Sequence, residues 1–378
     1  MSRKKVLIAY ATAGIGHKKA ALSVYEALKS GRADLDVKLI DVLDYANPLF
    51  KKTYTTTYLL LIKQLIFLWG ILYHITNCKI VYFLAAPIRK MYNVINCPVL
   101  VKFLLEYKPD VIISTHFLLP TVCDYIKKKY KIDMKVITVI TDYRVHSFWI
   151  SPGVDIYIAG HERVKEELIN KWGIPADKIE VMGIPVEPKF SAPHDKAALR
   201  RKFNIPEGSF VILLLSGGYG VGPFIKTLDV LNKVDFPLSA ITICGHNKNL
   251  REKVERARQG LKVNVMNLGY VDNVDELMAV SDIGVGKAGG ISSTEALNLG
   301  LPFAFIRVIP GQEKANAALC VNTGACVKVR NVKGLLNFIK EIKLSPDKLQ
   351  NMRKMISRIK KPNAASDIAE FIKNLTKE

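Results

Sequence analysis

Short apolar runs and helix-like amphipathic segments alternate along most of this chain. In the first half, the strand-like runs cover residues 6–10, 37–40, 111–114, 136–140 and 156–159. In the second half, they cover residues 210–215, 240–244, 263–266, 283–285 and 303–306. Strands separated by helices are typical of parallel sheets with right-handed crossovers. Two such sets therefore predict two Rossmann-like α/β domains.

The predicted boundary between the domains lies at residues 184–195, where prolines concentrate and no regular period continues. We expect an N-terminal domain at residues 1–190, a C-terminal domain at residues 191–346 and a helical tail at residues 347–378. A chain of 378 residues is long enough for two hydrophobic cores.

The segment 45–105 interrupts the alternation. It contains no Asp or Glu, but seven Lys or Arg and eleven aromatic residues. Its most apolar part, residues 58–73, is interrupted by Lys63 and Gln64 and is shorter than the roughly 20 residues that a membrane span needs. We expect a helix that lies in the membrane interface, and a buried core helix is the alternative. The basic residues predicted to face anionic lipid are Lys51, Lys52, Lys63, Lys79, Arg89 and Lys90, with Tyr58, Trp69 and Tyr73 at the headgroup level.

The chain is strongly basic, with a net charge of +21. Such an excess implies an anionic partner, which is a nucleic acid, an acidic lipid surface or a phosphorylated substrate. No nucleic-acid-binding motif accompanies the charge, so we expect no nucleic-acid partner. The six cysteines form no Cys-x-x-Cys pair and no zinc-like spacing with His. This pattern predicts reduced thiols in a cytoplasmic protein and no bound metal.

The sequence GKAGGISSTE, residues 286–295, follows an apolar run and precedes a helical pattern. A glycine-rich turn at a helix N-terminus presents free backbone N–H groups and the positive end of the helix dipole to an anion. Glu295 stands just inside the helix, where its carboxylate is close enough to accept hydrogen bonds from a sugar diol. The segment therefore predicts a site for a diphosphate with an attached ribose.

Two other loops in the second half carry groups suited to a nucleotide sugar. SGGYGVGP, residues 216–223, follows a strand but lacks the Lys-Ser/Thr of a P-loop, so ATP hydrolysis is disfavoured. This loop is either a second diphosphate turn or a purely structural one. VIPGQEKANA, residues 308–317, carries Gln312, Glu313 and Asn316, which are good partners for sugar hydroxyls. An ordinary polar loop is the alternative.

His17 follows the glycine turn at residues 14–16, at the start of a predicted helix. The helix dipole disfavours the imidazolium there, so the ring is expected to be neutral and able to accept a proton. A histidine that merely caps the turn is the alternative. As a dinucleotide fingerprint the turn fails, because Lys19 occupies the third glycine position, although Asp41 stands about where a ribose-binding acid would.

Residues 141–149, TDYRVHSFW, follow a predicted strand and group Asp142, His146 and Trp149. These side chains are candidates for an acid–base cluster or for a wall that binds an acceptor. An Asp–His pair with a local structural role is equally compatible with the sequence.

Five segments resemble the motifs of one family and occur in the expected order: GIGH at 14–17, SGGYGVGP at 216–223, CGHNKNL at 244–250, residues 269–297 and IPGQEKAN at 309–316. The family is the monogalactosyldiacylglycerol synthase and processive diacylglycerol glucosyltransferase group of glycosyltransferase family 28. The resemblance covers essentially the whole chain and implies a GT-B fold, with two Rossmann-like domains facing each other across a cleft. The chain has Ala288 where the family often has Pro, and Ser292 where Thr is common.

The resemblance also implies a role for each motif. His17 would take the proton of the lipid hydroxyl, and Asp142, His146 and Trp149 would belong to the acceptor side. The loops after the second-half strands would hold the uracil, diphosphate, ribose and hexose of the donor. The donor-binding residues would be Gly16, Ser216, Gly217, Gly218, Gly245, Asn247, Tyr270, Val271, Gly289, Gly290, Ser292, Ser293, Glu295, Gln312, Glu313 and Asn316.

We therefore expect an inverting transferase that moves glucose or galactose from a UDP-sugar to diacylglycerol. We expect it to be peripheral on the inner face of the cell membrane, with anionic lipids as partners and without cofactor or metal. The alternatives are a UDP-GlcNAc transferase acting on a polyprenyl-diphosphate-linked peptidoglycan precursor, an NAD-dependent oxidoreductase and a non-catalytic membrane-binding protein. The sequence leaves open the hexose, the number of sugars added, the preferred anionic lipid and the oligomeric state.

Overall fold

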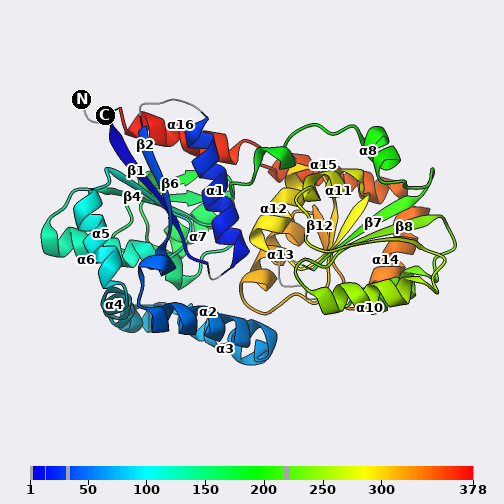
Figure 1. Cartoon of the computed structure of the whole chain (residues 1–378), viewed down its shortest axis with the longest axis horizontal. Helices are drawn as coiled ribbons and strands as arrows, with labels where there is room; N and C mark the ends of the chain where they lie inside the picture. Colours follow the sequence, from blue (N-terminus) through cyan, green and yellow to red (C-terminus); the bar gives the residue numbers. More distant parts are fainter. Residues whose placement is uncertain (1–2, 13, 31–34, 217–221, 378) are drawn as a thin grey trace. The chain divides into compact units, whose positions relative to one another are not determined.

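The chain folds into two compact units (Figure 1). The computed structural model describes residues 3–12, 14–30, 35–216 and 222–377, without the side chains of residues 58, 59, 62 and 63. The first unit comprises Met1–Pro188, Pro310–Gln312 and Asn363–Glu378, and the second comprises Lys189–Ile309 and Glu313–Pro362. Residues 347–378, which were predicted to form a helical tail, are therefore shared between the two units.

The first unit contains a parallel sheet of six strands in the order β2-β1-β3-β4-β5-β6. The strands are β1 (Lys4–Tyr10), β2 (Leu35–Asp41), β3 (Val111–Ser114), β4 (Lys135–Val139), β5 (Ile156–Ala159) and β6 (Ile179–Val181). The helices are α1 (Ile15–Lys29), α2 (Pro48–Lys63), α3 (Ile66–Thr76), α4 (Lys79–Asn96), α5 (Pro98–Tyr107), α6 (Leu118–Tyr130), α7 (Glu162–Trp172) and α16 (Ala364–Leu375).

Alternate residues of β1 pack into different hydrophobic cores on the two faces of this sheet. Val6 and Ile8 pack with residues of α1 and α16, whereas Leu7 and Ala9 pack with residues of α5 and α6. All four side chains are fully buried. A strand covered by helices on both faces has no polar side, which is why β1 appears in the sequence as a continuous apolar run.

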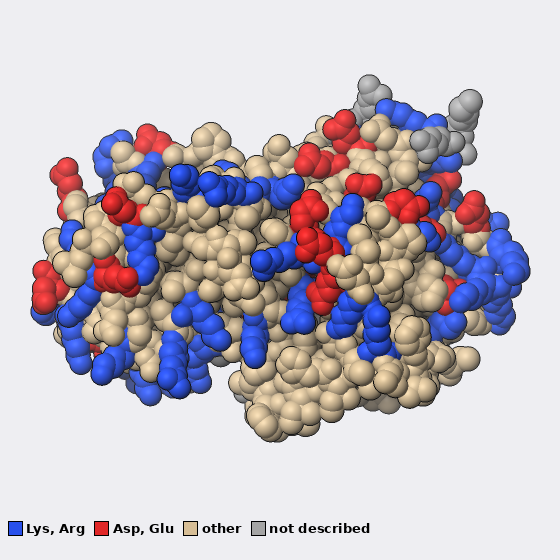
Figure 2. Space-filling model, turned by 180° about the vertical axis from the view of Figure 1, so that it is seen from behind, with Lys and Arg blue, Asp and Glu red and all other residues tan. Residues whose placement is uncertain are grey.

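Helices α2 to α5 occupy the acid-poor segment, and α2 and α3 lie side by side (Figure 1). They expose an unusual number of large apolar side chains to solvent. The most exposed are Leu49, Phe67, Ile80, Phe83, Leu84, Ile88 and Ile95, each with more than 60% of its surface accessible. In Figure 2 this part of the molecule forms a surface with few charged side chains. The segment is helical as expected, but it is only partly buried.

The second unit contains another parallel six-stranded sheet, in the order β12-β11-β10-β7-β8-β9. Its strands are β7 (Phe210–Leu215), β8 (Leu238–Ile243), β9 (Asn264–Leu268), β10 (Ile283–Gly286), β11 (Phe303–Phe305) and β12 (Cys326–Lys328). Its helices are α8 (Lys196–Lys202), α9 (Phe224–Leu231), α10 (Lys248–Arg258), α11 (Val274–Val280), α12 (Gly290–Asn298), α13 (Gln312–Asn322), α14 (Val332–Leu344) and α15 (Pro346–Ile359).

Each sheet reverses its winding once. In the first unit the chain runs from β1 to β2 on one side and then returns to place β3 on the other side of β1. In the second unit the corresponding point lies between β7 and β10. The loops at the carboxyl ends of the two strands diverge at such a point, and open α/β sheets bind their ligands there. The topology therefore predicts ligand sites at the loops after β1 and β3, and at the loops after β7 and β10.

Candidate active site

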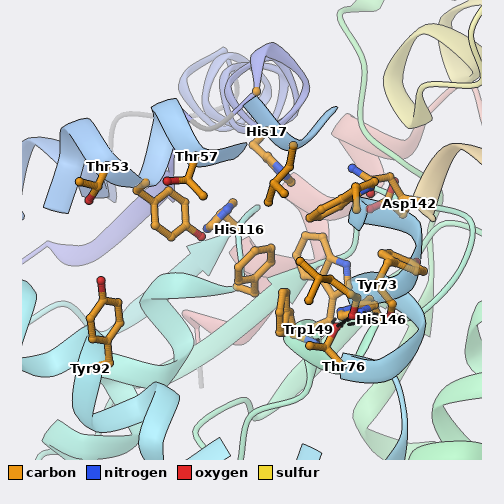
Figure 3. A pocket seen from close by; sticks show the side chains of 18 of the residues that line it. His17, Thr53, Thr57, Tyr73, Thr76, Tyr92, His116, Asp142, His146 and Trp149 are labelled. Carbon is orange, nitrogen blue, oxygen red and sulfur yellow. Dashed lines mark hydrogen bonds between the residues drawn. The ribbon is translucent and has the colours of Figure 1, made fainter. Parts of the chain in front are cut away.

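A cavity of about 480 Å³ lies at the switch point of the first sheet, between the loops after β1, β3 and β4 and helices α2 and α3 (Figure 3). His17, Asp142, His146 and Trp149, which the sequence predicts as the base and the acceptor side, all line it. The remaining lining is largely aromatic and aliphatic, and it includes Phe50 and Leu72. This arrangement suits an apolar molecule that presents a polar group to the histidines.

His17 is the third residue of α1, and its hydrogen bonds settle the position of its proton. The ring nitrogen Nδ1 lies 2.7 Å from the carbonyl oxygen of Thr115. A carbonyl oxygen only accepts, so Nδ1 carries the proton and Nε2 keeps a free lone pair in the neutral ring. Burial lowers the pKa of His17 to about 4, although the hydrogen bond to Thr115 acts in the opposite direction. The ring is therefore neutral at physiological pH and able to accept a proton at Nε2.

His116, which the sequence analysis did not select, stands beside His17 in the same cavity. The two rings are 4.8 Å apart between centroids and nearly perpendicular (Figure 3). The backbone N–H of Leu118 donates to Nδ1 of His116 at 3.2 Å. Burial and the neighbouring His17 hold the pKa of His116 well below its usual value. The residue follows β3 as His17 follows β1, but recognising this required the strand order.

His146 and Trp149 are held more firmly than the sequence suggests. The N–H of Phe148 donates to Nδ1 of His146 at 3.2 Å, and Nε2 of His146 lies 3.0 Å from the carbonyl oxygen of Tyr73. Both ring nitrogens are thus engaged within the protein, and His146 connects α3 to the loop after β4. Burial lowers the pKa of His146 to about 4. The Trp149 ring lies 6.0 Å from that of His17 and is almost fully buried.

In the second unit, the turn after β10 leads directly into α12, as predicted from GKAGGISSTE. β10 and β7 approach each other closely just before the turn: a Cβ at Gly286, the last residue of β10, would lie 2.5 Å from the carbonyl oxygen of Leu215 in β7. Ser293 and Glu295, in the first turns of the helix, are both buried. The hydroxyl of Ser293 has no hydrogen-bond partner among the described residues. A buried hydroxyl without a partner is costly, so its presence at a helix N-terminus fits a site that an anion completes.

Other predicted donor residues lie at the carboxyl ends of neighbouring strands in this unit. Ser216 directly follows β7, and its hydroxyl donates to the carbonyl oxygen of Ile243 at 2.7 Å. Gly245 follows β8 with a φ of 58°, and Asn247 caps α10 by accepting from the N–H of Leu250. Tyr270 and Val271 follow β9. The predicted residues Gly217 and Gly218 lie outside the described part of the chain.

Tyr270 is 58% exposed and stacks on His246, with ring centroids 4.5 Å apart and planes 11° apart. An exposed, flat pair of rings at the end of the sheet is a suitable surface for a base to stack on. His246 was not selected from the sequence, because a lone His in CGHNKNL gives no signal of stacking until the loops after β8 and β9 are known to be neighbours.

The loop after β11 is tied to the glycine turn by an ion pair. Nζ of Lys287 lies 3.5 Å from a carboxylate oxygen of Glu313, and the other carboxylate oxygen accepts from the N–H of Ile309. Asn316 is fully buried, and its amide donates to the carbonyl oxygen of Ala288 at 3.3 Å. These bonds bring two motifs that are distant in sequence to one place. Gly16 and Gln312, by contrast, belong to the first unit.

Two of the basic residues predicted to face lipid form polar contacts within the protein. Arg89 donates to the carbonyl oxygen of Ile150 at 3.1 Å and lies over the ring of Phe148. Lys90 pairs with the buried carboxylate of Asp124 at 3.0 Å. Both side chains therefore bind groups on neighbouring elements that the sequence pattern does not reveal, and their contact with anionic lipid stays a prediction.

The other aromatic and basic residues predicted to contact the membrane differ in how far they are buried. Tyr73 is buried, which contradicts its placement at the headgroup level, and Trp69 is partly buried beside the cavity. Lys51 pairs with Asp44 at the surface, Lys52 is exposed, and the side chain of Lys63 is outside the described part. What α3 and α4 present to solvent is mainly apolar.

No single helix among the described residues has the length and apolar character needed to cross a membrane. Helices α3 and α4 meet these criteria only together, as a pair bent by 95°. Across the same described residues, no group of three or more His, Cys, Asp or Glu side chains is placed to hold a metal ion.

The two units place the chain in the GT-B class of glycosyltransferase folds. Over 98% of this chain and 99% of the other, it resembles the crystal structure of *Acinetobacter baumannii* MurG, with a TM-score of 0.63 at 14% identity. It also resembles Alr3699/HepE from *Anabaena* in complex with UDP-glucose, with a TM-score of 0.58 at 16% identity, covering 99% of this chain and 100% of that one. At these identities the similarity establishes the fold alone.

Sequence comparison matches the chain to two family models. Residues 17–186 match the family model of monogalactosyldiacylglycerol synthase, and residues 225–371 match the C-terminal domain of glycosyltransferase family 28. Both matches agree with the family that the motifs of the chain resemble. The chain is 28% identical to the processive diacylglycerol beta-glucosyltransferases of *Bacillus pumilus* and *Bacillus subtilis*. Each match covers 98% of this chain and 95% of the relative.

Proposed function

We propose that this protein transfers a hexose, preferably glucose, from a UDP-sugar to the hydroxyl of diacylglycerol at a membrane surface. The observation that carries the proposal is the tautomer of His17. Its bond to Thr115 leaves Nε2 unprotonated in a cavity with mainly apolar walls. The names of the *Bacillus* relatives support diacylglycerol as the acceptor and glucose as the sugar.

The first unit binds the acceptor and supplies the base. The acyl chains lie against the aromatic and aliphatic walls of the cavity, and the glycerol hydroxyl points toward Nε2 of His17. As the hydroxyl oxygen bonds to the anomeric carbon, Nε2 takes its proton, and the bond from that carbon to the diphosphate oxygen breaks. UDP leaves with the electron pair. Attack from the face opposite UDP inverts the configuration at the anomeric carbon.

The second unit holds the donor. Backbone N–H groups at the start of α12 and the hydroxyl of Ser293 face the diphosphate, whose negative charge grows as its bond to the sugar breaks. Glu295 accepts from the ribose hydroxyls. The stacked pair of His246 and Tyr270 provides a flat surface for the uracil. Groups that are already oriented toward a developing charge lower the barrier without reorganising during the reaction.

The exposed apolar face of α3 and α4 attaches the enzyme to the bilayer, on the cytoplasmic side. Along α4 the apolar residues at 80, 83, 84, 88, 91 and 95 recur at helical spacing and are all exposed. An isolated soluble protein rarely exposes such a continuous surface. The excess of Lys and Arg adds attraction to anionic lipid, although Arg89 and Lys90 also have partners within the protein.

The direct test is to incubate the purified protein with diacylglycerol vesicles and either UDP-glucose or UDP-galactose, and to identify the lipid products by mass and anomeric linkage. We expect a β-linked glucosyl diacylglycerol. Transfer only from UDP-galactose would change the donor but keep the reaction class. Transfer of GlcNAc to a polyprenyl-diphosphate acceptor, with no glycolipid from diacylglycerol, would contradict the proposal.

A further inference from the structure

Two of the histidines that line the cavity, His17 and His116, are fixed by the backbone in opposite tautomers. His17 donates from Nδ1 to the carbonyl oxygen of Thr115, so its Nε2 is an acceptor. His116 accepts at Nδ1 from the N–H of Leu118, so the proton of its neutral ring is on Nε2. One ring therefore offers a lone pair and its neighbour offers an N–H.

The N–H of His116 has no hydrogen-bond partner within the part of the chain that the structure describes. The ring is 1% exposed, and it lines the cavity beside His17 (Figure 3). Among the described residues, no hydrogen bond from its Nε2 is found, although Nδ1 is bonded. Burying a donor without a partner costs free energy, so a group aimed into a cavity in this way points to an acceptor on the bound molecule.

The surrounding residues strengthen this conclusion. Phe117 packs against the His116 ring at 4.0 Å between centroids, and Tyr54 lies 6.1 Å away. Together with the bond from Leu118, these contacts hold the ring in place, so its N–H has a fixed direction. The hydroxyls of Thr53 and Thr76, which also line the cavity, donate to carbonyl oxygens of their own helices and are not directed at a ligand in the same way.

We propose that His116 is a specificity residue that donates its Nε2 hydrogen to an ester carbonyl oxygen of the acceptor. This inference rests on the proposed function. In diacylglycerol, the reacting hydroxyl and the nearest ester are on adjacent carbons of the glycerol. The paired histidines, 4.8 Å apart between ring centroids, complement these two groups: His17 accepts from the hydroxyl and His116 donates to the carbonyl. The residue thereby selects a diester over lipids that lack a carbonyl at this position.

The test compares dioctanoylglycerol with dioctylglycerol, the ether analogue that has no carbonyl, at saturating UDP-glucose. In the wild-type enzyme we expect kcat/KM to favour the diester by roughly tenfold, as one hydrogen bond to a neutral acceptor allows. His116→Phe keeps the ring volume and removes the donor, so it should abolish this preference by lowering diester activity alone. His116→Gln keeps an N–H near the same position and should restore part of the preference.

His146→Gln is the matched control, because His146 lines the same cavity but both of its nitrogens are bonded to backbone. Any loss in this variant should be equal for the two lipids. Equal losses in His116→Phe as well would overturn the proposal, because they would assign His116 a purely structural role. A wild-type enzyme without preference for the diester would overturn it too.

A binding measurement separates this proposal from the proposed function. Trp149 lies in the cavity wall, so tryptophan fluorescence can report lipid binding without turnover. If neither lipid is glycosylated, but the diester binds about tenfold more tightly than the ether and His116→Phe removes the difference, the ester site stands and the transferase assignment fails. If glycosylation occurs but binding and turnover show no difference between the lipids, the transferase assignment stands and the role of His116 fails.

Discussion

Three histidines around the cavity differ in how their ring nitrogens are used. His17 donates through Nδ1 and leaves Nε2 free, His116 accepts at Nδ1, and His146 uses both nitrogens for the backbone. Only His17 therefore combines a free lone pair with a position in the cavity. A sequence shows that a histidine is present, but the partner that selects its tautomer is distant along the chain: Thr115 is 98 residues from His17.

The low pKa of His17 predicts an unusual dependence of activity on pH. The base works only when neutral, and burial lowers its pKa to about 4, so the active form dominates above that value. We expect kcat/KM to rise with pH through an apparent pKa near 4 and to stay level through pH 6.5. The measurement is a pH–rate profile with diacylglycerol limiting. An acidic limb centred near 6.5 would indicate that His17 is solvated or is not the base.

A second prediction concerns Ser293, whose replacement should weaken UDP binding without lowering the stability of the fold. Its buried hydroxyl has no hydrogen-bond partner among the described residues, so Ser293→Ala should leave the free energy of unfolding nearly unchanged or slightly raised. The same change should weaken UDP binding roughly tenfold, because a bond to a charged phosphate oxygen is lost.

Calorimetry with UDP, together with thermal unfolding, measures both effects. Thr294→Ala is the control: its hydroxyl donates to the carbonyl oxygen of Gly290 within the helix, so UDP affinity should change little. Unchanged UDP affinity in Ser293→Ala would remove Ser293 from the donor site.

At the level of strands and helices, the sequence predicts most of what the structure contains. Ten of the twelve strands found among the described residues appear in the sequence as apolar runs, but β6 and β12 do not. Each of these has three residues and lies at an edge of its sheet, and neither is apolar throughout. Such strands form because a neighbouring strand offers hydrogen bonds, and that contribution is invisible in a local pattern.

The same limit explains the helices of the segment at 45–105. The absence of acidic residues correctly indicates an unusual surface, yet it does not reveal which cations face outward. Asp124, the partner of Lys90, is on α6, and the carbonyl oxygen of Ile150 that binds Arg89 follows β4. Both partners are supplied by the fold. The apolar positions of α4 were therefore a better guide to the exposed face than its basic positions.

A third prediction follows for α4. Phe83 and Ile88 are about 70% exposed on its apolar face, so replacing either with Asp should reduce binding to vesicles tenfold or more. Folding should be little affected, because neither side chain is buried. Leu344→Asp is the matched control: Leu344 is 85% exposed in the second unit, and its replacement should leave vesicle binding unchanged. Sedimentation with vesicles checks the result, and equal binding by all three variants would contradict attachment through this face.

In the chain as a whole, the two units divide the chemistry. The first carries His17, the proposed base, and a mainly apolar cavity, and the second carries a glycine turn, a helix N-terminus and a stacked aromatic pair. His17 and the glycine turn lie where the winding of their sheet reverses, between β1 and β3 or between β7 and β10, whereas the stacked aromatic pair follows β8 and β9. The sequence predicted both sets of loops from the order of strands and glycine turns. It missed His116 and His246, because the neighbours of a single histidine become known only when the fold shows which loops lie side by side.

The most direct test of this account is the transfer activity of His17→Ala. The variant lacks the base but retains every group proposed to bind UDP in the second unit, so we expect an unchanged dissociation constant for UDP. Transfer of glucose from UDP-glucose to diacylglycerol should fall roughly 10²–10⁴-fold, the usual contribution of a positioned general base. A variant that binds UDP normally and still glycosylates diacylglycerol within a few-fold of the wild-type rate would contradict the account.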